Sequence, residues 1–409
     1  MRKVLILTVT AGNGHNACAR AVKNALESSG DTEVKVVDLL KTFSTKMNVW
    51  IADGGYNLAM RRLPRIFTAF YDHYNRAKPE NRYSCAGQGV PLSTVDGLLK
   101  EIITYQPDVI YCCHFYGAIA LTDLKLAYDL PCKVIASVTN FCNTPFWEAA
   151  VGVDYLTLLN EDFIEEYVYE GFEKQKLLPI GRPVDMRTLS VDRAQAREKL
   201  GIGEDDFTVF VMYGGGNWGG SFALFKSVAK ALNGQRANII MINGKDKKSY
   251  SKIAKMKFTD GLNVINVGFT NEVPLYLSAA DVAIGKCGGG FTNETINAGV
   301  PMLITEKLAV NEIYNLDYLR KKGVALSFKN QKDLTDKLKY LKENPDKREQ
   351  MKGRMPSLKR NAVIKLTEII KAQPSADYSA LTAENIDFKN VRKIVKKAVK
   401  NADKLSKHK

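Results

Sequence analysis

The stretch VLILTVTAGNGHNACARAV, residues 4–22, joins an apolar run to a turn with two glycines and then to small residues at helical spacing. An apolar run before a glycine turn is typical of a buried strand, and the spacing after the turn predicts a helix over 15–29. Gly12 and Gly14 suit the turn because glycine accepts the sharp bend between a strand and a helix. We therefore expect the chain to begin with the strand–turn–helix unit of an α/β fold.

The histidine in this turn, His15, has two interpretations. In one, the glycines serve only the turn and His15 is a helix-start residue near the N-terminal amides. In the other, the turn at the carboxyl end of a parallel strand places amide donors and a titratable side chain at the edge of a ligand crevice. The stretch supports both equally. It is not a dinucleotide fingerprint, because Ala17 stands where that motif needs its third glycine.

Strand and helix signals continue to alternate through the first half of the chain. Helices are predicted at 94–105, 117–128 and 161–170, and strands at 3–9, 33–39, 108–114, 133–139, 155–159 and 176–184. The strands are apolar and rich in β-branched residues. This pattern indicates a parallel sheet covered by helices on both faces.

The alternation restarts after a seam at 184–206, where a charged helix ends in glycine. Further strands are predicted at 207–216, 237–245, 262–269, 281–286, 300–305 and 323–328, and two terminal helices within 340–372. We therefore predict an α/β chain with two Rossmann-like, doubly wound parallel-sheet domains. Two such domains are expected to face each other across a cleft, where ligands usually bind.

Composition narrows the class of protein. The 409 residues suit two domains, and no run of about 18 apolar residues predicts a spanning helix. The polar start of the chain does not fit a secretory signal. Seven scattered cysteines without metal-ligand spacing indicate free thiols in a reducing cytosol and no metal site. The net charge of +15 indicates a polyanionic partner, and no nucleic-acid-binding motif is present.

The segment 43–92 interrupts the alternation. It has no strand pattern and mixes Trp, Phe, Tyr and Leu with Arg and Lys. An amphipathic helix packed on the first domain explains this mixture, and composition alone favours it. A membrane-surface element explains it too, because aromatic side chains enter the interface while cations meet anionic headgroups.

Two glycine-rich loops stand in the second half of the chain. YGGGNWGG, residues 213–220, follows a predicted strand, and its glycines let backbone amides approach a ligand. In GKCGGGFTNETINAGVP, residues 285–301, Lys286 and three glycines precede a helix that we expect to start near Thr292. The lysine and the helix N-terminus suit a diphosphate. Glu294, expected in the first turn, suits the two hydroxyls of a ribose or complements the helix dipole.

These motifs together carry a family resemblance. TAGNGHNACARAV, YGGGNWGG, INGKDKKSY and GKCGGGFTNETINAGVPMLI resemble the monogalactosyldiacylglycerol synthases and processive diacylglycerol glucosyltransferases, over roughly residues 3–372. That family is related to the lipid II N-acetylglucosaminyltransferase and has the GT-B fold of family 28 glycosyltransferases. The resemblance implies inverting transfer of a hexose from a UDP-sugar to diacylglycerol or a glycosyldiacylglycerol.

The resemblance also implies roles for individual residues. On the acceptor side, Gly14 and His15 match the family's Gly-His pair, and 43–92 falls where the family contacts membrane. The donor-side residues match positions that contact the diphosphate, the uracil, the ribose and the sugar: Gly214, Gly215, Phe269, Lys286, Gly288, Gly289, Glu294, Asn311 and Glu312. No metal or redox cofactor is implied, because amides, a helix dipole and Lys286 offset the charge of the leaving diphosphate.

The chain departs from the family pattern at several positions. Asn140 stands where the family has Asp, and Thr144 where it has His, whereas Trp147 is retained. Cys287 replaces a proline and Phe291 a hydroxyl residue. Because an amide cannot act as a base, the role of general base is expected to fall to His15.

The expected organisation is an acceptor and membrane-side domain over 1–185 and a UDP-sugar-binding domain over 186–355. A terminal helix over 356–373 is expected to cross back to the first domain. The protein is expected in the cytoplasm, on the inner face of the cell membrane, with a UDP-sugar, a lipid acceptor and an anionic membrane surface as partners and no nucleic acid. Two alternatives are transfer to a soluble acceptor and a non-catalytic UDP-sugar sensor.

The last segment, 374–409, is a basic tail beyond the resemblance. Its final residues place an apolar stripe on one helical face, with lysines and arginines on the others. A solvated C-terminal helix is one interpretation. The other is a helix that lies on an anionic bilayer, held mainly by charge because the stripe is poor in large residues.

Overall fold

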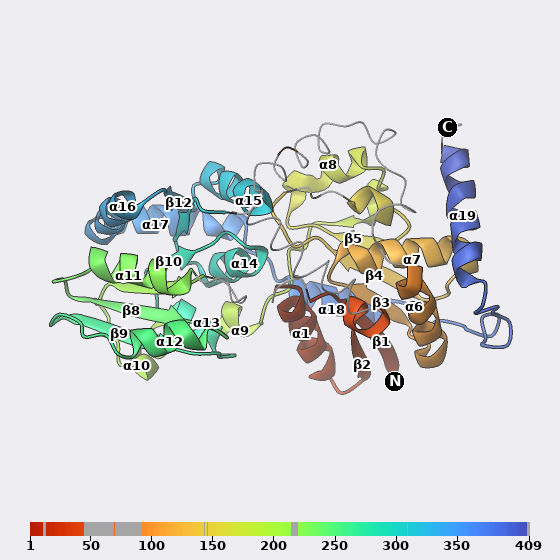
Figure 1. Ribbon diagram of the computed structural model, residues 1–409, viewed down its shortest axis with the longest axis horizontal. Coiled ribbons are helices and arrows are strands. Elements are labelled where there is room, and N and C mark those ends of the chain that lie inside the picture. Colours follow the sequence, from red (N-terminus) through yellow and green to blue (C-terminus); the bar gives the residue numbers. More distant parts are fainter. Residues whose placement is uncertain are drawn as a thin grey trace. The chain divides into compact units, whose positions relative to one another are not determined.

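The computed structural model describes residues 1–10, 14–44, 69, 92–142, 144, 146–213, 220–308 and 310–406. The chain divides into unit 1, Met1–Pro183 with Asn361–Lys409, and unit 2, Val184–Arg360. Each unit contains a six-stranded parallel sheet with helices around it (Figure 1). The prediction of an α/β chain with two parallel-sheet domains is therefore confirmed.

Unit 1 has the strand order β2-β1-β3-β4-β5-β6. The strands are β1 (Arg2–Thr8), β2 (Thr32–Asp38), β3 (Val109–Cys112), β4 (Lys133–Ser137), β5 (Tyr155–Thr157) and β6 (Leu177–Leu178). All residues of β3 are buried, as expected for a central strand covered on both faces. Because β1 lies between β2 and β3, the topological switch point of this sheet lies between β1 and β3, where α/β folds bind ligands.

The helices of unit 1 come from both ends of the chain. They are α1 (Gly14–Glu27), α2 (Leu39–Phe43), α6 (Leu92–Tyr105), α7 (Phe115–Tyr128), η4 (Trp147–Ala150), η5 (Glu161–Phe163), α8 (Ile164–Tyr169), η6 (Lys174–Lys176), α18 (Ala362–Ala372) and α19 (Val391–Ser406). From α18, Val363, Leu366 and Ile370 join the core that α1 and β1 form. The chain therefore returns to unit 1 after completing unit 2.

The C-terminal helix α19 is part of unit 1. The predicted apolar stripe is present, but Val391, Val395 and Val399 are at most 2% exposed. They are buried because α19 packs on α6 and α7, beside which it stands in Figure 1. Arg392 also donates from Nε to Asp96 Oδ2 at 2.5 Å. The hypothesis that this stripe lies on a bilayer is wrong, since the protein itself covers the stripe.

Unit 2 has the strand order β12-β11-β10-β7-β8-β9. The strands are β7 (Thr208–Met212), β8 (Ala237–Ile242), β9 (Leu262–Val267), β10 (Val282–Gly285), β11 (Met302–Thr305) and β12 (Ala325–Phe328). Read from β9, this is the 3-2-1-4-5-6 order of dinucleotide-binding sheets. The switch point lies between β7 and β10, and both glycine-rich loops follow these two strands.

The helices of unit 2 are α9 (Arg187–Ser190), α10 (Arg193–Leu200), α11 (Ser221–Ala231), α12 (Lys247–Ile253), α13 (Val273–Ser278), α14 (Gly289–Ala298), α15 (Val310–Lys321), α16 (Gln331–Glu343), α17 (Pro345–Gly353) and η7 (Met355–Ser357). The prediction of two terminal helices within 340–372 is confirmed, since α17 and α18 lie in this range, which also holds the end of α16 and the short η7. Pro345 cannot continue α16 but suits the first position of a new helix.

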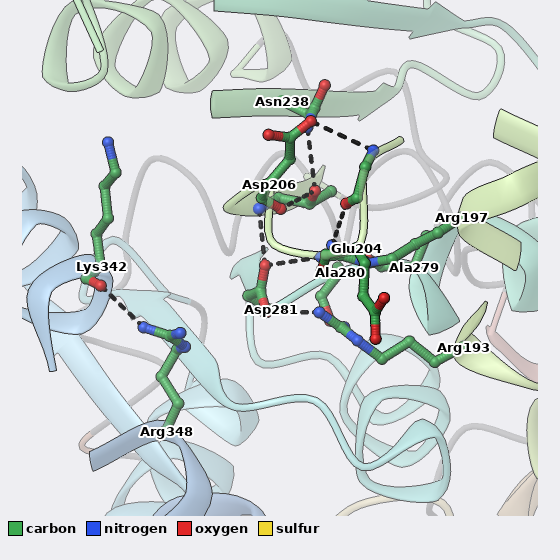
Figure 2. Close-up of polar contacts among 12 residues, drawn as sticks. Arg193, Arg197, Glu204, Asp206, Asn238, Ala279, Ala280, Asp281, Lys342 and Arg348 are labelled. Atoms are coloured by element: carbon green, nitrogen blue, oxygen red, sulfur yellow. Dashed lines mark hydrogen bonds and ion pairs between the residues drawn. The ribbon is translucent and has the colours of Figure 1, made fainter. Parts of the chain in front are cut away.

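A partly buried ion network joins α10 to the start of β10 (Figure 2). Asp281 accepts from Arg193 Nη2 at 2.7 Å, from Arg197 Nη2 at 2.9 Å and from the amide of Thr208 at 2.8 Å. Arg197 is 3% exposed and also donates to the carbonyls of Ala279 and Gly203. Because the arginines and the Thr208 amide all reach acceptors, this network fixes the charged helix predicted at the seam onto the sheet.

Among the described residues, no helix is both long enough and apolar enough to cross a bilayer. The segment 43–92 falls almost entirely outside the described residues, as do Gly214 and Gly215.

Candidate active site

Hydrogen bonds link the end of β1 to the first turn of α1 and to the end of β2. Thr8 Oγ1 donates to Asn16 Oδ1 at 2.9 Å, and Asn16 Nδ2 donates to Thr10 Oγ1 at 3.1 Å. Asp38, at the end of β2, accepts from the amide of Thr10 at 3.1 Å and caps α2 by accepting from the amide of Lys41 at 3.1 Å. Asp38 thus anchors two loops, and α1 begins at the carboxyl edge of the sheet.

His15 lies in the first turn of α1. Its Nδ1 is 2.6 Å from the carbonyl oxygen of Cys113, just after β3. A carbonyl only accepts, so Nδ1 carries the proton and Nε2 has a free lone pair. Burial lowers the pKa of His15 to about 4, and the charge of Arg182 acts in the same direction, against the hydrogen bond to Cys113. The side chain is therefore neutral at pH 7, with Nε2 available as an acceptor.

Gly14 is the first residue of α1, and Arg182 fixes it. The Arg182 side chain is 2% exposed, and its Nη2 donates to the carbonyl of Gly14 at 2.5 Å. Sequence reasoning did not assign Arg182 a role. It holds a positive charge beside His15, which adds to the effect of burial in lowering the pKa of that imidazole.

A second histidine, His114, accompanies His15 and was missed by the sequence analysis. The two rings are 4.7 Å apart between centroids and meet at 71°. His114 is the N-cap of α7, and its Nδ1 accepts from the amide of Tyr116 at 3.1 Å. It lies two residues after the end of β3, which pairs with β1, and this proximity to His15 could not be predicted before the strand order was known.

The predicted acceptor-side residues Asn140 and Trp147 follow β4, whereas Gly14 follows β1. Trp147 in η4 is 3% exposed, and its ring is 6.3 Å from that of Phe115. Phe115 in turn lies 4.2 Å from the ring of His114. Asn140 and Thr144 are half-buried and follow β4, the neighbour of β3. Gly14, His15 and Asn140 thus follow strands β1 and β4, which flank β3, and Trp147 joins them through aromatic contacts.

In unit 2, α14 begins earlier than predicted. Gly288 is its N-cap in extended conformation, and the amide of Thr292 donates to the carbonyl of Gly288 at 3.0 Å. The expected start near Thr292 is therefore wrong, and Glu294 lies in the second turn, half-buried. The first-turn amides, which have no partner within a helix, belong to the glycine stretch itself. The N-terminus of a helix attracts an anion through its amides and its dipole.

Lys286 lies at the switch point, near one side chain from α15 and one that directly follows β7. Its Nζ is 3.8 Å from Glu312 Oε2 and 5.1 Å from the centroid of the Tyr213 ring. A Cβ at Gly288 would lie 3.6 Å from Glu312 Oε1. Lys286, Gly288 and Glu312 are therefore neighbours, and Asn311 precedes Glu312 in the first turn of α15. A cation beside a helix N-terminus suits a diphosphate group.

The remaining predicted residues of unit 2 divide into exposed and buried groups. Phe269 follows the edge strand β9 and is 59% exposed, so its ring is available at the carboxyl edge of the sheet. Cys287 and Phe291, which depart from the family pattern, are 0% and 7% exposed and face the interior. Burial raises the pKa of Cys287 to about 12. Among the described residues, no three His, Cys, Asp or Glu side chains are arranged to hold a metal ion.

Two solved structures share this architecture. MurG of Acinetobacter baumannii superposes with a TM-score of 0.58 at 14% identity, over 91% of this chain and 99% of MurG. HepE of Anabaena, crystallised with UDP, gives 0.51 at 13% identity, over 91% and 98%. The fold of this chain is therefore GT-B, the two-domain fold of many glycosyltransferases.

Sequence comparisons identify the family. Residues 15–184 match the family model for monogalactosyldiacylglycerol (MGDG) synthase, and residues 208–367 match the glycosyltransferase family 28 C-terminal domain. The chain belongs to the glycosyltransferase family that includes the MGDG synthases and the processive diacylglycerol glucosyltransferases.

Two relatives represent its branches. A probable chloroplastic MGDG synthase of Glycine max is 24% identical over 346 residues, 81% of this chain and 64% of that protein. A processive diacylglycerol beta-glucosyltransferase of Bacillus pumilus is 21% identical over 373 residues, 87% of this chain and 91% of that protein. The chain thus spans less than two thirds of the plant relative's length.

Proposed function

We propose that this chain is an inverting glycosyltransferase that moves a hexose from a UDP-sugar to the hydroxyl of diacylglycerol or a glycosyldiacylglycerol at a membrane surface. The observation that carries the proposal is the state of His15. Its Nδ1 is bound to the Cys113 carbonyl at 2.6 Å, so that a neutral imidazole presents Nε2 at the switch point of unit 1. The family membership supports the same reaction.

In the proposed reaction the acceptor oxygen forms a bond to the anomeric carbon, on the face opposite the diphosphate. The bond between that carbon and the diphosphate oxygen breaks, and UDP leaves with its electron pair. The hydroxyl proton moves to His15 Nε2. The Cys113 carbonyl then stabilises the imidazolium because it already accepts from Nδ1. Asn140 cannot take this proton, which is why the role falls to His15.

The donor is proposed to bind unit 2 at the switch point between β7 and β10. Lys286 and the first-turn amides of α14 offset the charge of the leaving diphosphate, together with Gly214, Gly215, Gly288 and Gly289. We assign the ribose to Glu294, the sugar to Asn311 and Glu312, and the uracil to Phe269. The proposal needs no metal or cofactor besides the UDP-sugar. The UDP bound to HepE, which shares the fold, is in line with this assignment.

The membrane part of the proposal rests on α19. Its outward face carries exposed lysines that form no ion pair among the described residues: Lys393, Lys396, Lys397 and Lys400. Cations near an anionic bilayer contribute about 1 kcal/mol each at low salt. Since the apolar stripe of α19 is buried, we expect a salt-sensitive attachment without insertion, on the inner face of the cell membrane.

The test of the reaction is to incubate the purified protein with several UDP-hexoses and 1,2-dioctanoylglycerol, and to look for lipid that has gained one hexose. Hexosylated lipid with inverted anomeric configuration supports the proposal. Transfer only to a soluble acceptor would establish the first alternative. UDP binding without any transfer would establish the sensor.

Binding of the protein to an anionic membrane is tested by sedimentation with vesicles that contain phosphatidylglycerol. Replacing the four α19 lysines with glutamine should weaken binding at low salt. The matched control replaces four exposed unit-2 lysines and changes the net charge equally: Lys230, Lys255, Lys257 and Lys332. Equal binding by both variants would mean that α19 is not the attachment surface.

A further inference from the structure

The cap role of His114 defines the protonation state of its ring. Because its Nδ1 accepts from the Tyr116 amide at 3.1 Å, the proton of the neutral ring is on Nε2. The side chain is 8% exposed, and burial holds its pKa well below the usual value for histidine. His114 is thus a neutral N–H donor with a small accessible surface.

His15 has the opposite tautomer. Its Nδ1 donates to the carbonyl of Cys113, the residue directly before His114, so the end of β3 orients both rings. The centroids are 4.7 Å apart. Among the described residues, neither Nε2 has a hydrogen-bond partner. The site therefore pairs one acceptor nitrogen with one donor nitrogen, and a hydroxyl group needs this combination because it both donates and accepts.

We propose that His114 is a second acceptor-contacting residue: its Nε2–H donates to the oxygen of the attacking hydroxyl while His15 Nε2 accepts the hydroxyl proton. This inference rests on the proposed function. The hydrogen bond from His114 occupies one lone pair and leaves the other directed to the anomeric carbon. It also stabilises the negative charge that develops on the oxygen as the proton moves to His15.

The surroundings of the pair suit an acceptor with an apolar body. The half-buried ring of Phe115 lies 4.2 Å from His114, and Phe146 stacks on Phe115 at 5.4 Å. Phe146 has φ of 87°, an unusual conformation for an aromatic residue that proteins retain mostly at functional sites. Such an aromatic wall favours the glycerol and acyl carbons next to the hydroxyl and disfavours water as a competing acceptor.

Two substitutions distinguish the N-cap role of His114 from its proposed role as a hydrogen-bond donor to the acceptor hydroxyl. In His114→Asn the side-chain oxygen takes the place of Nδ1 and keeps the N-cap, but no N–H reaches the position of Nε2. In His114→Gln the longer side chain places an amide N–H near that position and loses the cap. If His114 is only a cap, the more stable variant, His114→Asn, should also be the more active one. If His114 is a donor, the less stable variant, His114→Gln, should be the more active one.

We expect His114→Asn to keep the melting temperature while kcat/KM for dioctanoylglycerol falls about ten- to a hundredfold. His114→Gln should melt at a lower temperature yet retain more activity than His114→Asn, and both should bind UDP like the wild type. Wild-type activity in His114→Asn would overturn the inference. So would a His114→Gln variant that is no more active than His114→Asn.

A second readout does not depend on turnover. Long-range ¹H–¹⁵N spectra should show the proton on Nδ1 of His15 and on Nε2 of His114, and dioctanoylglycerol should shift both Nε2 resonances. A proton on Nδ1 of His114, or no shift at its Nε2, would overturn the inference. If the wild-type protein transfers no hexose, the proposed function fails, and these spectra still decide the role of His114.

Discussion

His15 should remain a competent base far below the pH at which an ordinary histidine is lost. Its pKa is lowered from 6.5 to about 4 by burial, with the charge of Arg182 acting in the same direction. At pH 5 a base with pKa 4 is still about 90% deprotonated, whereas one with pKa 6.5 is only about 3% deprotonated. The two cases therefore differ about 30-fold in the active fraction of enzyme.

The assay is kcat/KM for the lipid acceptor between pH 4 and 8, because this ratio reports ionisations of the free enzyme. Activity should hold from pH 7 to about 5 and fall toward pH 4. Replacing Arg182 with methionine should move the fall to higher pH, since the nearby cation disfavours protonation. A half-maximum near pH 6.5 in the wild type would refute the reasoning. Circular dichroism at each pH is the control for unfolding. Between pH 4 and 6.5 His15 is protonated in the unfolded chain but not in the folded chain, so the free energy of unfolding decreases as the pH is lowered through this window.

Three further outcomes are expected. Glu294→Gln should weaken UDP binding by roughly 1–3 kcal/mol in calorimetry, and the control Glu343→Gln on the surface of unit 2 should leave it unchanged. Unchanged UDP affinity in Glu294→Gln would mean that Glu294 does not bind the ribose. In urea-induced unfolding, Val395→Ala should lower the free energy of unfolding by about 1–2 kcal/mol, and the control Lys396→Ala by less than about 0.5 kcal/mol. Equal losses in the two variants would contradict the packing of α19 on α6 and α7. Asp281→Asn should cost about 3 kcal/mol because it leaves the buried Arg197 without its counter-charge, and an unchanged melting curve would contradict this.

Much of the fold was predictable because most strands are short apolar runs that end in a glycine or polar turn. The unit at 4–22 became β1 and α1, and the restart near 207 became β7, since local periodicity determines both. The helix ends were less predictable. The backbone of glycine is equally compatible with a loop and a helix, so the extension of α14 back to Gly289 left no signal in the sequence.

The candidate site was predictable only where one local motif contains it. His15 and Lys286 each stand in a glycine turn after a strand, which marks them from the sequence alone. His114 and Arg182 lie about 100 and 170 positions after His15 in the sequence, and only the strand order brings them next to it. The α19 stripe shows the same limit: spacing predicted which residues share a face, but not that α6 and α7 cover it.

The central claim is that His15 is the base of a hexosyl transfer to a lipid hydroxyl. The most direct measurement is single-turnover transfer from a UDP-hexose to dioctanoylglycerol by the wild type and by His15→Ala, with UDP affinity measured in parallel. If His15 is the base, the variant should lose about 100-fold or more in rate and keep nearly the same UDP affinity. Equal losses of rate and UDP affinity, or full activity in the variant, would contradict it.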